Sequence, residues 1–283
     1  GMAESGEIDI YNFPIGSRIA PEEFVEFQSS YDLFISKNEQ FRNRYEELKR
    51  KSESEAKPLI ITEGKTDWKH LKFALKKLRL NGRCISLDVD FFEYESEVNM
   101  GDIRLSQMCN HMATLPQKRK MIFVFDRDNP TITKSMSGSP QEFKDWGNNV
   151  YSVCLPIPAH RINYKNLSIE LYYTDQTLRA TDPETGKRLW FSNEIEIITK
   201  PTTGQKIYRA QAAPSADDEF EKKVFDQPAD QIIDTNGRPV GLSKSAFAEI
   251  ITNTTQDSNS IDISAFANFF EVLEKICNTA GTV

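Results

Sequence analysis

Short apolar strands alternate with amphipathic helices between residues 57 and 180, and this alternation constrains the fold more than any other feature of the chain. The predicted elements are strands at 58–62, 84–94, 121–125 and 150–157 and helices at 67–80 and 102–115. Strands that alternate with helices form βαβ units, whose strands lie parallel. We therefore expect an α/β fold with a mainly parallel sheet flanked by helices.

The segments on either side of this region do not show the same alternation of strands and helices. Residues 1–56 contain apolar side chains spaced by three and four positions from Phe24 to Leu48, which predicts one long N-terminal helix. This helix either packs on the core of the protein, which its bulky aromatic seam favours, or forms a coiled-coil dimer. The sequence of residues 181–283 predicts β-hairpins followed by two helices near 243–252 and 263–278. We expect an N-terminal helical segment at 1–56, an α/β domain at 57–180 and a C-terminal α+β extension at 181–283.

The composition limits the environment and the partners of the chain. The 283 residues carry 35 Lys and Arg against 42 Asp and Glu, a net charge of −7, which excludes a generally basic nucleic-acid coat but not a local basic patch. No apolar run is long enough to span a membrane, and no secretory signal begins the chain. The four cysteines form no CxxC pair, which fits a reducing cytoplasm. We expect a cytoplasmic protein with no membrane partner.

Acidic clusters follow two of the predicted strands directly. Glu63 and Asp67 come after the strand at 58–62, and Asp126 and Asp128 come after the strand at 121–125. The carboxyl ends of parallel strands are where ligand sites form in α/β sheets. Crowded carboxylates need a compensating cation, and oxygen ligands suit Mg²⁺. The alternative to a metal site is a pair of solvated acidic loops. Gly64 allows a tight turn into the following helix, whose first amides can face a phosphate.

These motifs resemble the Toprim family, the metal-binding module of topoisomerases, bacterial primases and OLD-type (overcoming lysogenization defect) nucleases. The family pattern is a Glu in a strand–turn–helix and, later, an Asp-x-Asp after another strand. Residues 61–67 and 122–128 carry this pattern, and the resemblance covers roughly residues 57–175. It implies a Toprim-like sheet in which Glu63 is a general acid/base or metal ligand. It also implies that Asp126 and Asp128 bind Mg²⁺, or Mn²⁺ in its place, with Arg127 between them in a supporting position.

Features that are missing narrow the resemblance to the nuclease branch of the family. The chain has no room for the DNA-gate domains of topoisomerases, no cysteine cluster for the zinc of primases, and no ATPase domain before residue 57. A stand-alone or OLD-type nuclease Toprim protein remains. A further acidic residue often follows in that branch, and Glu170 is the candidate here, against the alternative of a glutamate on a surface helix. The resemblance therefore implies cleavage of phosphodiester bonds in DNA or RNA.

The helix that begins at the first acidic cluster is strongly basic. Only Asp67 is acidic between residues 65 and 83, and this stretch contains seven basic side chains: Lys65, Lys69, Lys72, Lys76, Lys77, Arg79 and Arg83. A basic helix beside a metal site can guide a nucleic-acid backbone toward it. The lysines at 65, 69, 72 and 76 are the candidate contacts. A lysine-rich solvated face is the structural alternative.

Other interpretations of the motifs stay open. An Asp-x-Asp after an apolar strand is also typical of haloacid-dehalogenase-type phosphatases, although Pro130 departs from their motif and Glu63 has no role in them. The non-enzymatic alternative is a non-catalytic nucleic-acid-binding or assembly protein that keeps the acidic site for metal alone. Asp88 and Asp90 form a second Asp-x-Asp, which we interpret as the polar face of a strand. Nothing in the residues indicates the oligomeric state.

Overall fold

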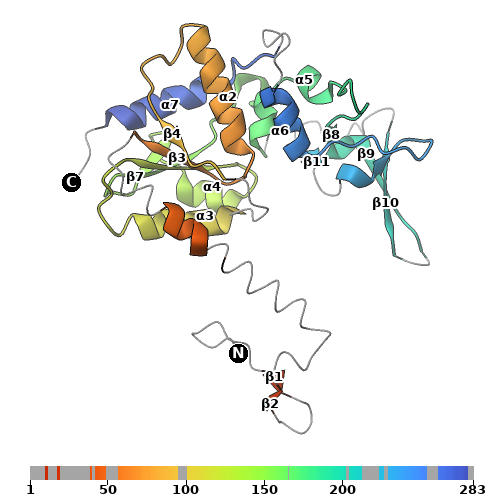
Figure 1. Ribbon diagram of the computed structural model, residues 1–283, viewed down its shortest axis with the longest axis horizontal. Helices are drawn as coiled ribbons and strands as arrows, with labels where there is room; N and C mark the ends of the chain where they lie inside the picture. The colour runs from red at the N-terminus through yellow and green to blue at the C-terminus, as the bar shows by residue number, and fades with distance from the viewer. Residues whose placement is uncertain are drawn as a thin grey trace. The chain divides into compact units, whose positions relative to one another are not determined.

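The computed structural model shows a chain that divides into two compact units, Gly1–Lys51 and Ser52–Val283 (Figure 1). The structure describes residues 10–11, 18–19, 39, 42–48, 57–94, 101–164, 166–201, 204–211, 223–225, 229–253 and 261–279. In the first unit, β1 (Ile10–Tyr11) pairs with β2 (Arg18–Ile19) in antiparallel fashion. Residues 42–48 are helical, at the end of the predicted N-terminal helix. The rest of that predicted helix, apart from Glu39, lies outside the described residues.

A five-stranded sheet forms the centre of the second unit. Its strands are β3 (Leu59–Thr62), β4 (Asp90–Phe91), β5 (Met121–Phe125), β6 (Phe143–Asp145) and β7 (Val150–Cys154). They are arranged in the order β4-β3-β5-β7-β6, and all neighbours are parallel except β6, which is antiparallel to β7. Every residue of β3, β5 and β7 is buried, as expected for strands covered on both faces. The prediction of an α/β fold with a mainly parallel sheet is confirmed.

Helices cover both faces of this sheet (Figure 1). On one face, α2 (Asp67–Leu80) packs against β3 and against α7 (Phe266–Asn278). On the other face, α3 (Gly101–Met112) and α4 (Pro130–Met136) pack against β5 and β7. The apolar stripe of α7 (Phe266, Phe269, Phe270, Leu273 and Ile276) is fully buried in the same core as the stripe of α2 (Leu71, Leu75 and Leu78). The sheet and these four helices form the body that carries the acidic clusters.

The predicted strand at 84–94 is wrong for most of its length. Only Asp90 and Phe91 pair with β3, and the residues before them form a loop. Cys84 has a left-handed φ of 53°, which interrupts an extended chain. Leu87 and Val89 are buried, but Ile85, on the same predicted face, is 71% exposed. The apolar alternation therefore came from a loop that covers the end of α2, where the Arg79 side chain donates a hydrogen bond to the Leu87 carbonyl.

Small strands and short helices make up the region after β7. These elements are η2 (Ala159–Arg161), η3 (Ile169–Tyr172), α5 (Asp175–Arg179), β8 (Trp190–Phe191), η4 (Ser192–Glu194), β9 (Ile195–Thr199), β10 (Lys206–Ala210), β11 (Val224–Phe225), η6 (Ala229–Gln231), β12 (Ile232–Ile233) and α6 (Lys244–Asn253). β9 and β10 form a hairpin, and β12 adds to it in parallel. Helix α6 packs beside α2, so this α+β region reaches the parallel sheet and belongs to the same compact unit. Among the described residues, no helix has the length and apolar character needed to cross a bilayer.

Candidate active site

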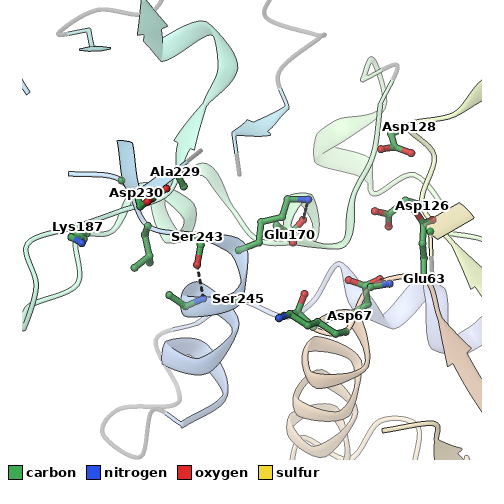
Figure 2. A pocket seen from close by; sticks show the side chains of 18 residues that line it. Glu63, Asp67, Asp126, Asp128, Glu170, Lys187, Ala229, Asp230, Ser243 and Ser245 are labelled. Atoms are coloured by element: carbon green, nitrogen blue, oxygen red, sulfur yellow. Dashed lines mark hydrogen bonds and ion pairs between the residues drawn. The ribbon is translucent and has the colours of Figure 1, made fainter. Parts of the chain in front are cut away.

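The two acidic clusters meet at one edge of the sheet. Strands β3 and β5 are parallel neighbours with Thr62 opposite Val124, so Glu63 and Asp126 leave the sheet side by side. Both line a cavity of about 810 Å³, together with Asp67, Asp128 and Glu170. Figure 2 shows these carboxylates gathered on one side of the cavity. Five acidic side chains from three separate segments of the chain therefore line one cavity.

The turn between β3 and α2 requires a glycine. The Gly64 backbone N–H donates a hydrogen bond of 2.7 Å to Oδ2 of Asp67, and its carbonyl accepts one of 3.1 Å from Oγ1 of Thr62. A Cβ atom at position 64 would lie 2.6 Å from Oδ1 of Asp67, closer than any real contact. Asp67 is buried at the first position of α2, where the partial positive charge of the helix N-terminus favours a carboxylate. Gly64 thus permits the close approach that holds Asp67 in the cavity wall.

Burial and mutual repulsion change the proton affinity of this cluster. Burial, followed by repulsion from Asp67 and Asp128, raises the pKa of Glu63 from 4.5 to about 8. Burial and the charge of Glu170 raise the pKa of Asp67 from 3.8 to about 6. The pKa of Asp126 is also raised well above its ordinary value, by burial and then by Asp67. In the absence of a cation, the cluster therefore retains protons at a pH where isolated carboxyls are ionised.

Glu170 differs from the other carboxylates because it has a cationic partner. It is 1% exposed and lies on η3, where it accepts a hydrogen bond of 2.7 Å from Oγ of Ser168. Its Oε2 atom lies 3.0 Å from Nζ of Lys244, the first residue of α6. Burial alone would raise the pKa of Glu170, but Lys244 and His70 lower it. Glu170 is therefore an ionised carboxylate inside the cavity wall.

Lys244 is a site residue that the sequence analysis missed. Burial alone would lower its pKa, but Glu170, Asp126 and Asp67 raise it above the ordinary value for lysine. Its ammonium group is thus the internal cation that compensates part of the carboxylate cluster. No local motif marks this lysine, since it stands at the start of an ordinary helix far along the chain from the acidic clusters. Only the packing of α6 against α2 brings it to the site.

A buried arginine holds the segment that carries Glu170. Arg161 is 4% exposed, and its guanidinium donates hydrogen bonds of 3.1 Å to the Leu171 carbonyl and 3.0 Å to the Tyr173 carbonyl. The same group forms an ion pair with Asp175 at 2.6 Å. One rigid guanidinium therefore joins the C-terminal end of η3, which carries Glu170, to the start of α5.

The opposite side of the cavity is mixed in charge. Figure 2 shows Lys187, Asp230, Ser243 and Ser245 across from the acidic group, and Lys65 also lines the cavity. The Oγ atom of Ser243 accepts a hydrogen bond of 3.1 Å from the backbone N–H of Ala246 and so satisfies an amide in the first turn of α6. The cavity therefore has a carboxylate wall and a wall with basic and hydroxyl groups.

Except for Lys65, the remaining predicted site residues lie outside this cavity. Lys69, Lys72 and Lys76 line a separate hollow on α2, whereas Lys65 belongs to the cavity itself. Arg127 has a structural position, because its backbone N–H donates to the Leu167 carbonyl at 2.8 Å and its Nε donates to the Leu155 carbonyl at 2.6 Å. Both bonds join the end of β5 to the segment that leads into η3.

The donor chemistry of the cavity suits a hard divalent cation. The Oε2 atom of Glu63 is buried and has no hydrogen-bond partner, which leaves an oxygen lone pair unsatisfied. In their present positions, however, no three His, Cys, Asp or Glu side chains among the described residues form a group that could hold a metal ion. The carboxylates of the cavity therefore fit Mg²⁺ in the type of their donor atoms, but in their present positions they form no joint set of ligands.

Comparisons with protein-family models, with curated proteins and with solved structures found no match for this chain. The resemblance to the Toprim family therefore stays a prediction from the motifs.

Proposed function

We propose that this protein is a Mg²⁺-dependent phosphodiesterase that cleaves DNA or RNA in the carboxylate cavity. The observation that carries the proposal is the meeting of Glu63, Asp126 and Asp128 at the carboxyl ends of two adjacent parallel strands. A cluster of carboxylates with raised pKa values and an unpaired buried oxygen is costly for a fold to maintain. Such a cost is typical of functional sites. The Toprim resemblance of the same three residues supports this reaction class.

Each carboxylate has its own role in this proposal. Asp126 and Asp128 would hold the cation, and Mn²⁺ could replace Mg²⁺ because both prefer oxygen ligands. The bound cation neutralises charge on the phosphoryl group and lowers the pKa of water. Glu63, whose pKa of about 8 in the metal-free protein lies near neutrality, is the general acid/base. Glu170 stays ionised and orients Lys244 toward the cluster.

Lys244 and Lys65 supply the positive charge that a phosphodiester needs. When a cation binds the carboxylates, it takes over the compensation that Lys244 provides in the metal-free protein. The Lys244 ammonium is then able to interact with a phosphate oxygen while it remains anchored on Glu170. Lys65 lines the same cavity, so a phosphate group in the site meets two ammonium groups and the first turn of α6.

Incubation with labelled oligonucleotides tests the proposal. Single- and double-stranded DNA and RNA are each incubated with the full chain in Mg²⁺, in Mn²⁺ and in EDTA. We expect cleavage in the presence of either metal, none in EDTA, and a loss of about 10²-fold or more in the single-turnover rate for Glu63→Gln. Binding of the oligonucleotide by Glu63→Gln should stay within a few-fold of wild type. Asp88→Asn, in the second Asp-x-Asp motif and exposed, is the matched control and should cleave normally.

Two results would replace this proposal with an alternative interpretation of the motifs. Binding of nucleic acid without cleavage under any of these conditions would indicate a non-catalytic binding or assembly protein. Hydrolysis of p-nitrophenyl phosphate through a trapped aspartyl-phosphate at Asp126 would indicate a phosphatase.

A further inference from the structure

A second hollow, which we call the α2 groove, runs along α2 away from the carboxylate cavity. It has a volume of about 640 Å³ and lies between α2, the β4 strand and the last turn of α6. The lining of the carboxylate cavity reaches Asp67, and the lining of the α2 groove begins at the next residue, Trp68. The groove continues to Leu80 at the end of the helix, roughly 20 Å away at the rise of an α-helix. The cavity and the groove are thus separate hollows that begin at neighbouring residues of α2.

The floor of the α2 groove is apolar and partly aromatic. Phe73, Val89 and Phe91 contribute to it, and Trp68 is held in place by a hydrogen bond of 3.2 Å from its Nε1 to the Tyr94 carbonyl. Leu80, at the far end, is 78% exposed. Trp68 and Val89 are almost fully buried, so Phe73, Phe91 and Leu80 are the side chains that lose contact with water when a flat apolar ligand covers the floor.

The rim of the α2 groove is basic. Four basic residues of α2 line it (Lys69, Lys72, Lys76 and Arg79), and Glu249 is the acidic lining residue. Lys69 pairs with Glu249. Lys72 lies 2.5 Å from Glu93, but both side chains are about half exposed, so this pair is weak and easily exchanged for another anion. Lys76 is exposed beside them. The rim therefore offers positive charge to an anionic ligand.

We propose that the α2 groove binds an unpaired strand of nucleic acid that extends from the carboxylate cavity, with its bases on the apolar floor and its phosphates against Lys72 and Lys76. This inference rests on the proposed function, because a strand can extend from the cavity to the groove only if a phosphodiester occupies the cavity.

The chemistry of the groove favours an unpaired strand over a duplex. In a duplex the base faces are stacked inside, and the sugar–phosphate backbone alone would meet this apolar floor. An unpaired strand exposes its base faces, which stack on aromatic side chains, while its phosphates contact a basic rim. An acidic peptide would satisfy the lysines equally well, but it would not account for the position of the groove beside the proposed site for phosphodiesters. The proposed substrate class is therefore single-stranded nucleic acid or a duplex with a single-stranded end.

Fluorescence anisotropy of the full chain tests this inference. The probes are a fluorescein-labelled oligothymidine of about 20 nucleotides and a duplex of the same length, each measured in EDTA so that binding is observed without cleavage. We expect the single strand to bind at least about tenfold more tightly than the duplex, since each stacked base adds affinity that a duplex cannot gain. Equal affinities for the two probes would overturn the proposal.

Variants of the rim and of the floor locate the binding to the groove. Lys72→Glu/Lys76→Glu should weaken single-strand binding at least about tenfold and reduce the slope of log affinity against log salt by about 1.4, from two lost phosphate contacts. Phe73→Ala and the exposed Leu80→Ser should each weaken single-strand binding several-fold and leave duplex binding unchanged. Lys118→Glu/Lys134→Glu, which alters two exposed lysines outside α2, is the matched control and should change neither. Groove variants that bind the single strand like wild type would overturn the proposal.

Failure of this inference and failure of the proposed function give different results. If the single strand binds through the groove and no metal supports cleavage, the groove assignment stands and the nuclease proposal fails. If cleavage depends on Asp126 while the groove variants bind and cleave like wild type, the nuclease proposal stands and the groove assignment fails. Displacement of the oligothymidine by polyglutamate at an equal concentration of charges would overturn the nucleic-acid assignment in favour of an acidic protein segment.

Discussion

The Nζ atom of Lys244 lies 3.0 Å from Oε2 of Glu170, and this pair brings the C-terminal region of the chain into the cavity formed by the parallel sheet. Glu170 is 1% exposed, so its charge depends on the partner that α6 supplies. Glu63, Asp67 and Asp126, which line the same cavity, have raised pKa values because of burial and the neighbouring carboxylates. The cavity thus combines one compensated carboxylate with a cluster that needs a cation.

The Lys244–Glu170 pair should contribute to stability through the cost of an unpaired buried charge. Lys244→Met leaves Glu170 buried without a cation and should lower the free energy of unfolding by about 2–3 kcal/mol at pH 7. Glu170→Gln should lower the free energy of unfolding by a smaller amount, because Lys244 is half-buried and can reach water. The double variant should therefore be more stable than the sum of the two single losses predicts. Urea unfolding in EDTA measures all three, and strictly additive losses would show that the two side chains do not interact.

The pH dependence of stability should reveal the raised pKa of Glu63. Its folded-state pKa of about 8 exceeds its unfolded value of 4.5, so the folded protein binds the extra proton between these two pH values. This contribution to stability is complete below pH 4.5 and is lost as the pH rises to about 8. In EDTA the unfolding temperature should decline across this window. The unfolding temperature of Glu63→Gln should decline less steeply between pH 6 and 8, a range that lies above the pKa of about 6 of Asp67. An identical slope in wild type and variant would contradict the assignment.

Asp126→Asn should separate metal binding from folding. Loss of one oxygen donor and one charge should weaken Mg²⁺ or Mn²⁺ binding at least about tenfold in a calorimetric titration. Because burial and Asp67 raise the pKa of Asp126, removal of its charge should leave the metal-free protein as stable as wild type or more so. Asp88→Asn serves again as the control, since Asp88 is exposed and forms an ion pair with Lys57 at the surface. Unchanged metal affinity in Asp126→Asn would exclude Asp126 as a ligand.

Gly64→Ala should disturb the site through a single methyl group. The new Cβ would lie 2.6 Å from Oδ1 of Asp67, so the carboxylate must move and lose its hydrogen bond of 2.7 Å from the Gly64 amide. We expect a loss of about 1–3 kcal/mol in the free energy of unfolding and a marked loss of cleavage. Gly64→Ala/Asp67→Ala removes the clash and should be less destabilised than the sum of the single variants. Wild-type stability and cleavage in Gly64→Ala would show that the turn accommodates a Cβ atom at position 64.

Local patterns in the sequence were sufficient for the elements that carry the acidic clusters. The periodicity of residues 67–80 predicted α2 with the bounds that the structure has, and the apolar run 121–125 predicted β5 in the same way. Glu63 and Asp126 could be placed at neighbouring strand ends because parallel βαβ units direct successive strand ends to one edge. These inferences depend on side chains a few positions apart, which the sequence displays directly.

Tertiary packing decided what local patterns could not. The alternation at 84–94 predicted a strand that is mostly a loop, because only Asp90 and Phe91 pair with the distant strand β3. The short strand β6 and helix α4 were not predicted, although β6 forms a local hairpin with β7 and Asn129 caps α4 just before Pro130. The sequence by itself determined the parallel α/β core and the position of its acidic strand ends. Only the three-dimensional structure decided that Glu170 is buried in the same cavity and that Lys244 compensates it, because a pair of charges on η3 and α6 exists only when those two segments pack against α2.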